Sequence, residues 1–174
     1  PAGVFTQVSA GYHHTCGLRA DGTLACWGSN GDYAATPPAG SLFGQRRIST
    51  GWDFTCGVRS NGALFCWGEN GYGQATPPTG TFSQVSAGLW HTCGVRSNGT
   101  LACWGENTYG QSTPPAGTFT QVSAGFFHTC GLQSDGMLAC WGYNGFGQAT
   151  PLVGEFVQVS ADGYHACGLR GDGT

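Results

Sequence analysis

The chain has 174 residues, of which only 9% are charged and 32 are glycine, and its formal net charge is −3. All six basic residues are arginine, and they form no basic stripe, so the composition excludes a nucleic-acid footprint and a polybasic membrane patch. No apolar run approaches the roughly 20 residues of a membrane-spanning helix, and we expect no membrane insertion. Glycine and proline spread at intervals favour many short strands joined by tight turns.

A Cys-Gly pair recurs along the chain at spacings of 40, 37, 37 and 37 residues, beginning at Cys16, Cys56, Cys93, Cys130 and Cys167. A period of this length is typical of a solenoid, a propeller or another array. Four units are nearly complete, and the sequence stops within the fifth. We therefore expect one repeat array over residues 1–174, with units at approximately 5–40, 41–80, 81–117, 118–154 and 155–174.

Each unit divides into three short strands, and in the fourth unit we expect them over 119–124, 128–133 and 137–142. The residues Ser134-Asp135-Gly136, between the second and third strands, fit a type I turn followed by a left-handed glycine. The Gly- and Pro-rich segment after the third strand is predicted to be a loop that could carry a short fourth edge strand. No segment has a helical period, so the sequence predicts an all-β fold.

The three-residue turn fixes the register of the hairpin and thereby pairs the cysteines. In the first unit Cys16 faces Cys26, and opposed residues in a non-hydrogen-bonded pair lie close enough for a disulfide. The same arithmetic predicts one cross-strand disulfide in each of the next three units, namely Cys56–Cys66, Cys93–Cys103 and Cys130–Cys140. Cys167 is left unpaired because its partner strand is missing. Disulfides imply an oxidising compartment, so we expect an extracellular or cell-surface protein.

A metal site is the alternative reading of the same residues. Strand alternation places His14 on the same face as Cys16, opposite Cys26, and three such ligands could hold zinc or copper. Against a metal, the second unit keeps both cysteines but has Phe54 in the histidine slot. We therefore favour disulfides, expect no cofactor, and interpret the histidines as structural residues hydrogen-bonded to neighbouring backbone.

The third unit shows the complete motif, which comprises Ala87-Gly88, His91-Thr92, Cys93-Gly94-Val95, Asn98-Gly99, Leu101, Cys103-Trp104-Gly105, Asn107 and Gly110-Gln111. This pattern resembles the regulator-of-chromosome-condensation type of repeat, in the short cysteine-bearing version of bacterial secreted proteins and plant crinkly-type receptor-kinase ectodomains. The resemblance covers the whole chain and implies a β-propeller, commonly of seven blades. Between four and five blades are present here, so we expect part of a longer ring.

The units also contain features outside the cysteine motif. The first unit has Gly31-Asp32-Tyr33-Ala34 in place of Gly-Tyr-Gly-Gln, and a three-residue insertion within 41–50 carries Arg46-Arg47. The first departure puts the geometry of the first loop in question. One tryptophan per complete unit alternates to the face opposite the disulfide, and we expect each to pack against the next blade. These are Trp27, Trp67, Trp104 and Trp141.

The two residues before the histidine slot change in every unit, while the sequence around them is held. Scaffold positions should look alike in each copy, so variable positions that stay aromatic indicate a surface adapted to a ligand. The alternative is a packing role, in which these bulky residues fill gaps between blades that fit together imperfectly. The candidate binding surface consists of Tyr12, His13, Trp52, Asp53, Leu89, Trp90, Phe126, Phe127 and Tyr164.

No catalytic motif or paired carboxylate constellation is present, and the leading hypothesis is an extracellular, non-catalytic module that binds a protein partner through its loop face. Carbohydrate binding is the first alternative, because the variable aromatic residues could stack on sugar rings. A structural surface or fibre component, self-associating through Cys167 or an open blade edge, is the second. The resemblance also implies nucleotide exchange on a small GTPase, a cytosolic or nuclear role that disulfides oppose.

Overall fold

The structure is a computed structural model that describes residues 2–38 and 43–174, without the side chains of residues 43–47. The described residues form strands and turns and contain no helix, and therefore none of the length and apolarity that crossing a membrane requires. The strands are β1 (Phe5–Ala10), β2 (His14–Arg19), β3 (Leu24–Gly28), β4 (Phe43–Thr50), β5 (Phe54–Arg59), β6 (Leu64–Gly68), β7 (Phe82–Ala87), β8 (His91–Arg96), β9 (Leu101–Gly105), β10 (Phe119–Ala124), β11 (His128–Gln133), β12 (Leu138–Gly142), β13 (Gln158–Asp162) and β14 (His165–Leu169).

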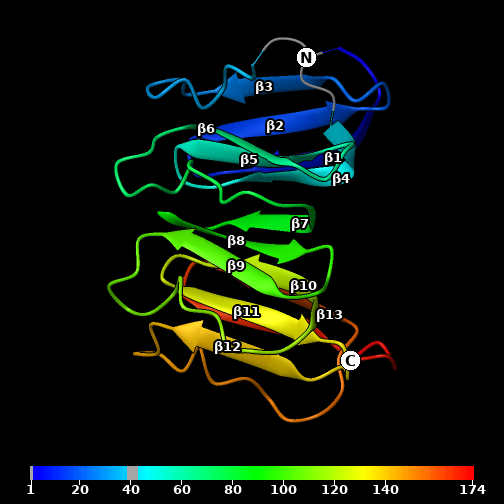
Figure 1. Ribbon diagram of the computed structural model, residues 1–174, viewed down its shortest axis with the longest axis vertical. Helices are drawn as coiled ribbons and strands as arrows, with labels where there is room; N and C mark the ends of the chain where they lie inside the picture. Colours follow the sequence, from blue (N-terminus) through cyan, green and yellow to red (C-terminus); the bar gives the residue numbers. More distant parts are fainter. Residues whose placement is uncertain (1, 39–42) are drawn as a thin grey trace.

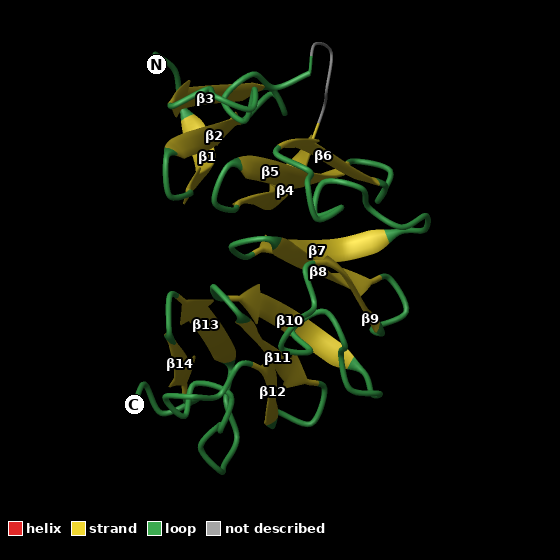
Figure 2. Ribbon diagram, turned by 90° about the vertical axis from the view of Figure 1, so that its left-hand side faces the viewer, coloured by secondary structure: helices red, strands yellow, loops and turns green. Residues whose placement is uncertain are grey.

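These strands form five antiparallel sheets in sequence order. Four sheets have three strands each, β1-β2-β3, β4-β5-β6, β7-β8-β9 and β10-β11-β12, and the fifth pairs β13 with β14. The sheets are stacked one after another along the chain (Figure 1) and form an arc with the first strand of each on its concave side (Figure 2). The first strand of each sheet, here called the inner strand, contacts the inner strand of the next sheet throughout, β1 with β4, β4 with β7, β7 with β10 and β10 with β13. The predicted all-β propeller architecture is therefore confirmed.

The hairpins follow the expected register. Cys93 pairs with Cys103 in the ladder between β8 and β9, and the glycine of the turn, Gly99, has a φ of 84°. The four predicted disulfides are present, Cys16–Cys26, Cys56–Cys66, Cys93–Cys103 and Cys130–Cys140, and Cys167 is free and exposed. The prediction of a short fourth edge strand is wrong for the described loops, which form turns and bends instead.

The inserted residues of the second unit fall partly outside the described residues, because 41 and 42 are not described. Phe43 of β4 pairs with Arg59 of β5, and Ile48 pairs with Gly57. The chain therefore advances by five residues in β4 while it advances by only two in β5. In the third blade the matching step is three residues, from Phe82 to Val85. Part of the insertion is thus absorbed as a wider bulge in an inner strand, which leaves the ladder beyond Ile48 in register.

The hydrophobic core lies between blades. The disulfide face of one blade packs on the following blade, as Cys56 and Val58 do on Phe82 and Val85, and Trp104 of that following blade joins the same cluster. Trp67, Trp104 and Trp141 therefore pack against the preceding blade, and the expectation of the next blade is wrong for them. Trp27 of the first blade is exposed and contacts Phe5 of its own blade. Strand alternation turns the cysteine and tryptophan of one hairpin to opposite faces, and since the disulfide face meets the following blade, the tryptophan face meets the preceding one.

Polar side chains add a second connection between neighbouring inner strands. The Gln84 side chain donates from Nε2 to the Val122 carbonyl (3.0 Å) and accepts from the Val122 amide at Oε1 (2.8 Å). Gln7 and Gln121 make the same pair of bonds to Ile48 and Val159. Each such glutamine extends the hydrogen bonding of one sheet into the next and fixes the blades in axial register.

Candidate binding face

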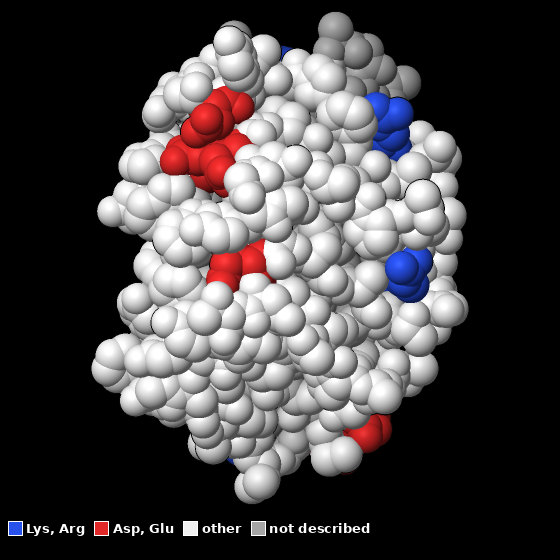
Figure 3. Space-filling model, turned by 60° about the vertical axis from the view of Figure 1, so that its left-hand side comes forward, with Lys and Arg blue, Asp and Glu red and all other residues white. Residues whose placement is uncertain are grey.

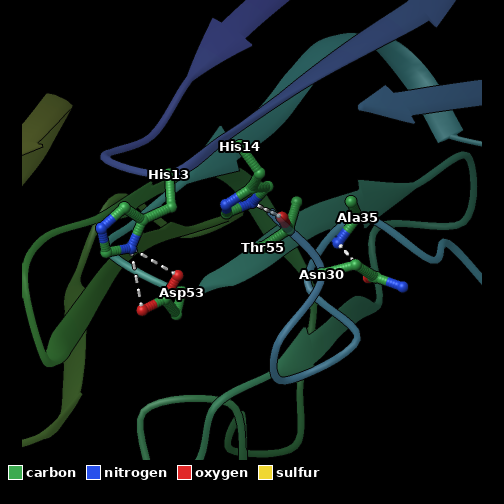
Figure 4. Close-up of polar contacts among 6 residues, drawn as sticks. All are labelled: His13, His14, Asn30, Ala35, Asp53 and Thr55. Atoms are coloured by element: carbon green, nitrogen blue, oxygen red, sulfur yellow. Dashed lines mark hydrogen bonds and ion pairs between the residues drawn. The ribbon is translucent and has the colours of Figure 1, made fainter. Parts of the chain in front are cut away.

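The histidine slot lies beneath the loop face and connects adjacent blades. Nε2 of His14 lies 2.7 Å from Oγ1 of Thr55 in the second blade (Figure 4). The sulfurs of Cys16 and Cys26 are bonded to each other, so the metal alternative with His14 is wrong. The partner of His14 is a side-chain hydroxyl, so the expectation of a backbone partner is wrong too. His14 and His91 are therefore structural links between blades, whereas neither ring nitrogen of His128 has a side-chain hydrogen-bond partner among the described residues.

The third blade shows which tautomer this link requires. Thr129 donates its hydroxyl proton to the Gln111 carbonyl (3.2 Å), so Nε2 of His91 must donate to Thr129 Oγ1 (2.8 Å). Complete burial lowers the pKa of His91 from its ordinary 6.5 to about 3, with a smaller contribution from His128 nearby. His91 is therefore neutral, with its proton on Nε2.

The turns between first and second strands converge on the concave side of the arc. They line an axial pocket of about 210 Å³, to which Tyr12, Trp52, Leu89 and Phe126 each contribute from a different blade. Tyr12 and Trp52 stack with ring centroids 3.6 Å apart, and Trp52 meets Phe126 edge to face at 6.1 Å. The first variable residue of each of these four units thus faces a shared space.

The second variable residues lie farther from the axis. Nδ1 of His13 lies 3.0 Å from Oδ1 of Asp53 (Figure 4), a hydrogen bond that bridges the first two blades. Trp90, Phe127 and Tyr164 belong instead to a continuous surface of rings, here called the aromatic arc. Its members are Tyr72, Trp90, Tyr109, Phe127, Tyr143, Phe146 and Tyr164.

The rings of the aromatic arc are accessible and enclose a concave space. Five of them, Tyr109, Phe127, Tyr143, Phe146 and Tyr164, line a cavity of about 360 Å³. Phe146 is 72% exposed and Tyr109 48%, which is far more than rings of a blade core would be. Most neighbouring rings meet edge to face, an arrangement that leaves ring faces free for a ligand.

An asparagine and a glutamine that recur in the loops of the second, third and fourth units position the arc. In the third unit Asn107 Oδ1 accepts the Ser112 amide (2.8 Å), and Gln111 Oε1 accepts the Tyr109 amide (2.9 Å). The Gln111 carbonyl in turn accepts the indole N–H of Trp141 in the following blade (2.9 Å). The backbone that carries Tyr109 is therefore tied to the blade framework on both sides, which holds the ring in place without burying it.

The first loop keeps this geometry despite its altered sequence. Asn30 Oδ1 accepts the Ala35 amide (3.0 Å), and the Ala34 carbonyl accepts the indole N–H of Trp67 (3.0 Å). The backbone is strained at Tyr33, whose φ of 60° lies in the left-handed region that glycine occupies at Gly73 and Gly110. The first loop therefore folds alike but places Asp32, not an aromatic residue, in the slot of Tyr72.

Sequence reasoning did not identify Tyr72, Tyr109, Tyr143 and Phe146 as surface residues. Three of them occupy one repeat position, where recurrence of an aromatic residue suggests scaffold. A usable signal was present, because an aromatic residue between Asn-x and Gly-Gln sits in a turn with no apolar neighbours in sequence to bury it.

An arc of antiparallel blades that pack face to face, four of them with a disulfide between two of their own strands, is the architecture of a β-propeller. The chain belongs to the regulator of chromosome condensation (RCC1) repeat family, whose repeat matches residues 5–33, 46–74, 82–111 and 119–148. No curated protein matches the chain as a whole.

Solved structures show the same fold. The CRINKLY WD40 ectodomain of the Arabidopsis thaliana receptor kinase ACR4 is 29% identical, with a TM-score of 0.77 over 96% of this chain and 59% of that one. The ectodomain of the Physcomitrella patens receptor kinase CR4 is 32% identical, with a TM-score of 0.78 over 95% and 47%. Yeast RCC1 (Prp20), solved with Kap60, is 17% identical, with a TM-score of 0.78 over 95% and 54%. The chain thus spans about half of each of these proteins.

Proposed function

We propose that the protein is an extracellular interaction module that binds a protein partner through its loop face without catalysing a reaction. The observation that carries the proposal is the aromatic arc, a contiguous set of rings on a rigid framework, of which four are exposed and three are half-buried. Exposed aromatic surface of this kind marks interaction sites, where rigid rings contribute most of the binding energy. No nucleophile–base pair lies among the rings of the arc, which supports binding over catalysis.

The extracellular setting is supported by two observations. The four disulfides require an oxidising compartment in which to form and persist. In addition, the two similar structures from Arabidopsis thaliana and Physcomitrella patens are ectodomains of receptor kinases.

The experiment is affinity capture by the immobilised protein from the extracellular fraction of the cells that produce it, with matched surface variants. A protein retained by the wild type and lost on Trp90→Ala and Phe127→Ala would support the proposal. Arg96→Ala is the control, because Arg96 lies at the far end of β8 from the loop face. Equal capture by all variants would place binding elsewhere and overturn the proposed site.

Carbohydrate binding is the second candidate, favoured by one observation. The cavity of about 360 Å³ is lined entirely by aromatic side chains, and ring faces of this kind stack on the apolar faces of sugars. A glycan array probed with the wild type and with Tyr143→Ala separates the two candidates. Saturable glycan binding lost in the variant would favour the lectin, and an array without binding would remove it.

A further inference from the structure

The axial pocket contains one position at which the five blades are not alike. The residue that follows the Ser-Ala or Ser-Thr pair of the inner strand is glycine in the first four units, at Gly11, Gly51, Gly88 and Gly125. In the fifth unit the same slot holds Asp162, which lines the axial pocket beside Tyr12, Trp52 and Phe126. The repeat therefore places one carboxylate among the aromatic rings of a shared pocket.

Glycine at this slot is a packing requirement of the blades. A Cβ on Gly11 would lie 2.2 Å from the Gly51 carbonyl oxygen, and one on Gly88 would lie 2.4 Å from that of Gly125. A side chain in the slot is thus tolerated only where no such carbonyl presses on it. Asp162 is thus a departure from the residue that this packing requires at Gly11, Gly51 and Gly88.

The carboxylate of Asp162 is open to a ligand. Its side chain is exposed, and Oδ1 accepts only the amide of the adjacent Gly163 (2.8 Å). It forms no ion pair with any described residue. A carboxylate oxygen accepts more than one hydrogen bond, so this group keeps capacity for a donor brought from outside.

The charges of the molecule are distributed unevenly between the loop face and the hairpin ends of the blades. The arginines whose side chains are described, Arg19, Arg59, Arg96 and Arg170, lie at the hairpin ends of their blades, away from the loop face. Asp21, Asp135 and Asp172 lie at those same hairpin ends and offset their charge. The loop face instead carries Asp53, Glu69, Glu106 and Asp162 and none of these arginines. In Figure 3 the acidic side chains at the left stand opposite the basic ones at the right, with one acidic group also at the lower right. The loop face therefore attracts a cation.

We propose, resting on the proposed protein-binding function, that the axial pocket takes an arginine side chain of the partner. The guanidinium would donate to Asp162 and lie against the rings of Trp52 and Phe126. A planar guanidinium suits this pocket because it pairs with a carboxylate in a fork and stacks on aromatic faces, whereas an ammonium is a compact point charge that offers neither the fork nor a flat face.

The experiment is an NMR titration of the ¹⁵N-labelled protein with the peptide amide Gly-Gly-Arg-Gly-Gly, read at the indole N–H of Trp52. The matched peptide Gly-Gly-Gln-Gly-Gly has a neutral side chain. Asp162→Gly restores the residue of the other four units, so it should fold, and Asp162→Asn removes the charge alone. Asp135→Asn is the control, because it removes one exposed carboxylate from a hairpin at the opposite end.

We expect saturable shifts with the arginine peptide, about tenfold weaker affinity in both Asp162 variants and in Trp52→Ala, and unchanged affinity in Asp135→Asn. Equal binding of the glutamine peptide, or equal weakening by Asp135→Asn, would overturn the inference. The captured partner separates the two proposals. If its capture is lost on Trp90→Ala but unchanged in Asp162→Gly, the protein-binding function stands and the arginine site fails.

Discussion

Nε2 of His91 lies 2.8 Å from Oγ1 of Thr129, so that a buried hydrogen bond joins the third blade to the fourth. The second blade shows how the boundary is closed without it. Phe54 occupies the histidine slot there, and Thr92 still donates to the Gln74 carbonyl (3.0 Å). The threonine hydroxyl thus donates its hydrogen bond whether the preceding blade offers histidine or phenylalanine, whereas the histidine needs the threonine oxygen as its acceptor.

Thr129→Val is therefore expected to destabilise the protein more than His91→Phe. The first leaves a buried Nε2–H without an acceptor, which costs about 1–3 kcal/mol. The second reproduces a slot that the chain already fills with Phe54. Urea unfolding of both variants gives the two free energies, and the reverse order would show that the hydrogen bond contributes little to the boundary.

The free energy of unfolding should fall as the pH drops below about 6.5. The pKa of His91 is lowered to about 3 in the folded protein, so below 6.5 the unfolded chain takes up a proton that the native state excludes. Stability is complete above 6.5 and declines towards pH 3, by at most about 1.4 kcal/mol per pH unit for this residue. Burial also lowers the pKa of His14 and His128, which adds to the decline.

Urea unfolding at pH 7.5 and pH 5.0 measures this dependence, with His91→Phe as the matched variant. The variant should lose less stability between the two pH values than the wild type. An identical loss in both proteins would mean that His91 accepts a proton without unfolding the blade boundary.

Four disulfides and one free thiol should be found in the protein secreted or refolded under oxidising conditions. Its intact mass should be lower by eight hydrogens than after reduction, two for each disulfide, and iodoacetamide should label Cys167 alone. Replacing Cys93 and Cys103 together by alanine should cost about 2–3 kcal/mol, since their bond closes a short loop. Cys167→Ser is the control and should leave stability unchanged. Labelling of two or more cysteines would contradict the assignment.

Tyr33→Gly should stabilise the protein by about 1 kcal/mol, because Tyr33 holds a left-handed φ of 60° that glycine adopts without steric cost. The reciprocal change, Gly110→Ala, should destabilise it by a similar amount, since Gly110 has a φ of 80° and open space around it. The midpoints of thermal unfolding for both variants test the pair. A destabilised Tyr33→Gly would show that the tyrosine ring makes contacts that outweigh its backbone strain.

The strands, the turns and all four disulfides could be predicted because each is set by residues close in sequence. A three-residue turn ending in Gly99 leaves only one register, and that register brings Cys93 opposite Cys103. The direction in which Trp104 packs could not be predicted, because alternation tells which residues share a face but not which neighbour that face meets. The partner of His91 was missed for the same reason, since Thr129 lies in another blade.

The candidate face was predicted in part. The variable residues Trp52 and Phe126 do share a pocket, because equivalent turns converge where the inner strands approach one another. The contribution of Tyr109 and Phe146 was not foreseen, because their constant repeat position resembles scaffold and their exposure depends on how the loop turns back on itself.

The glycines of the axial slot determine how the blades are arranged, and the residues beside them determine which ligand the pocket binds. Since Gly11 and Gly88 contact the carbonyl of the next blade directly, the curvature of the array is set by backbone against backbone. The neighbouring residues, Tyr12 and Leu89, can then be exchanged without altering how far each blade is rotated from the last. Units of this kind could be shuffled or recombined as interchangeable modules, each bringing its own side chain to a common opening.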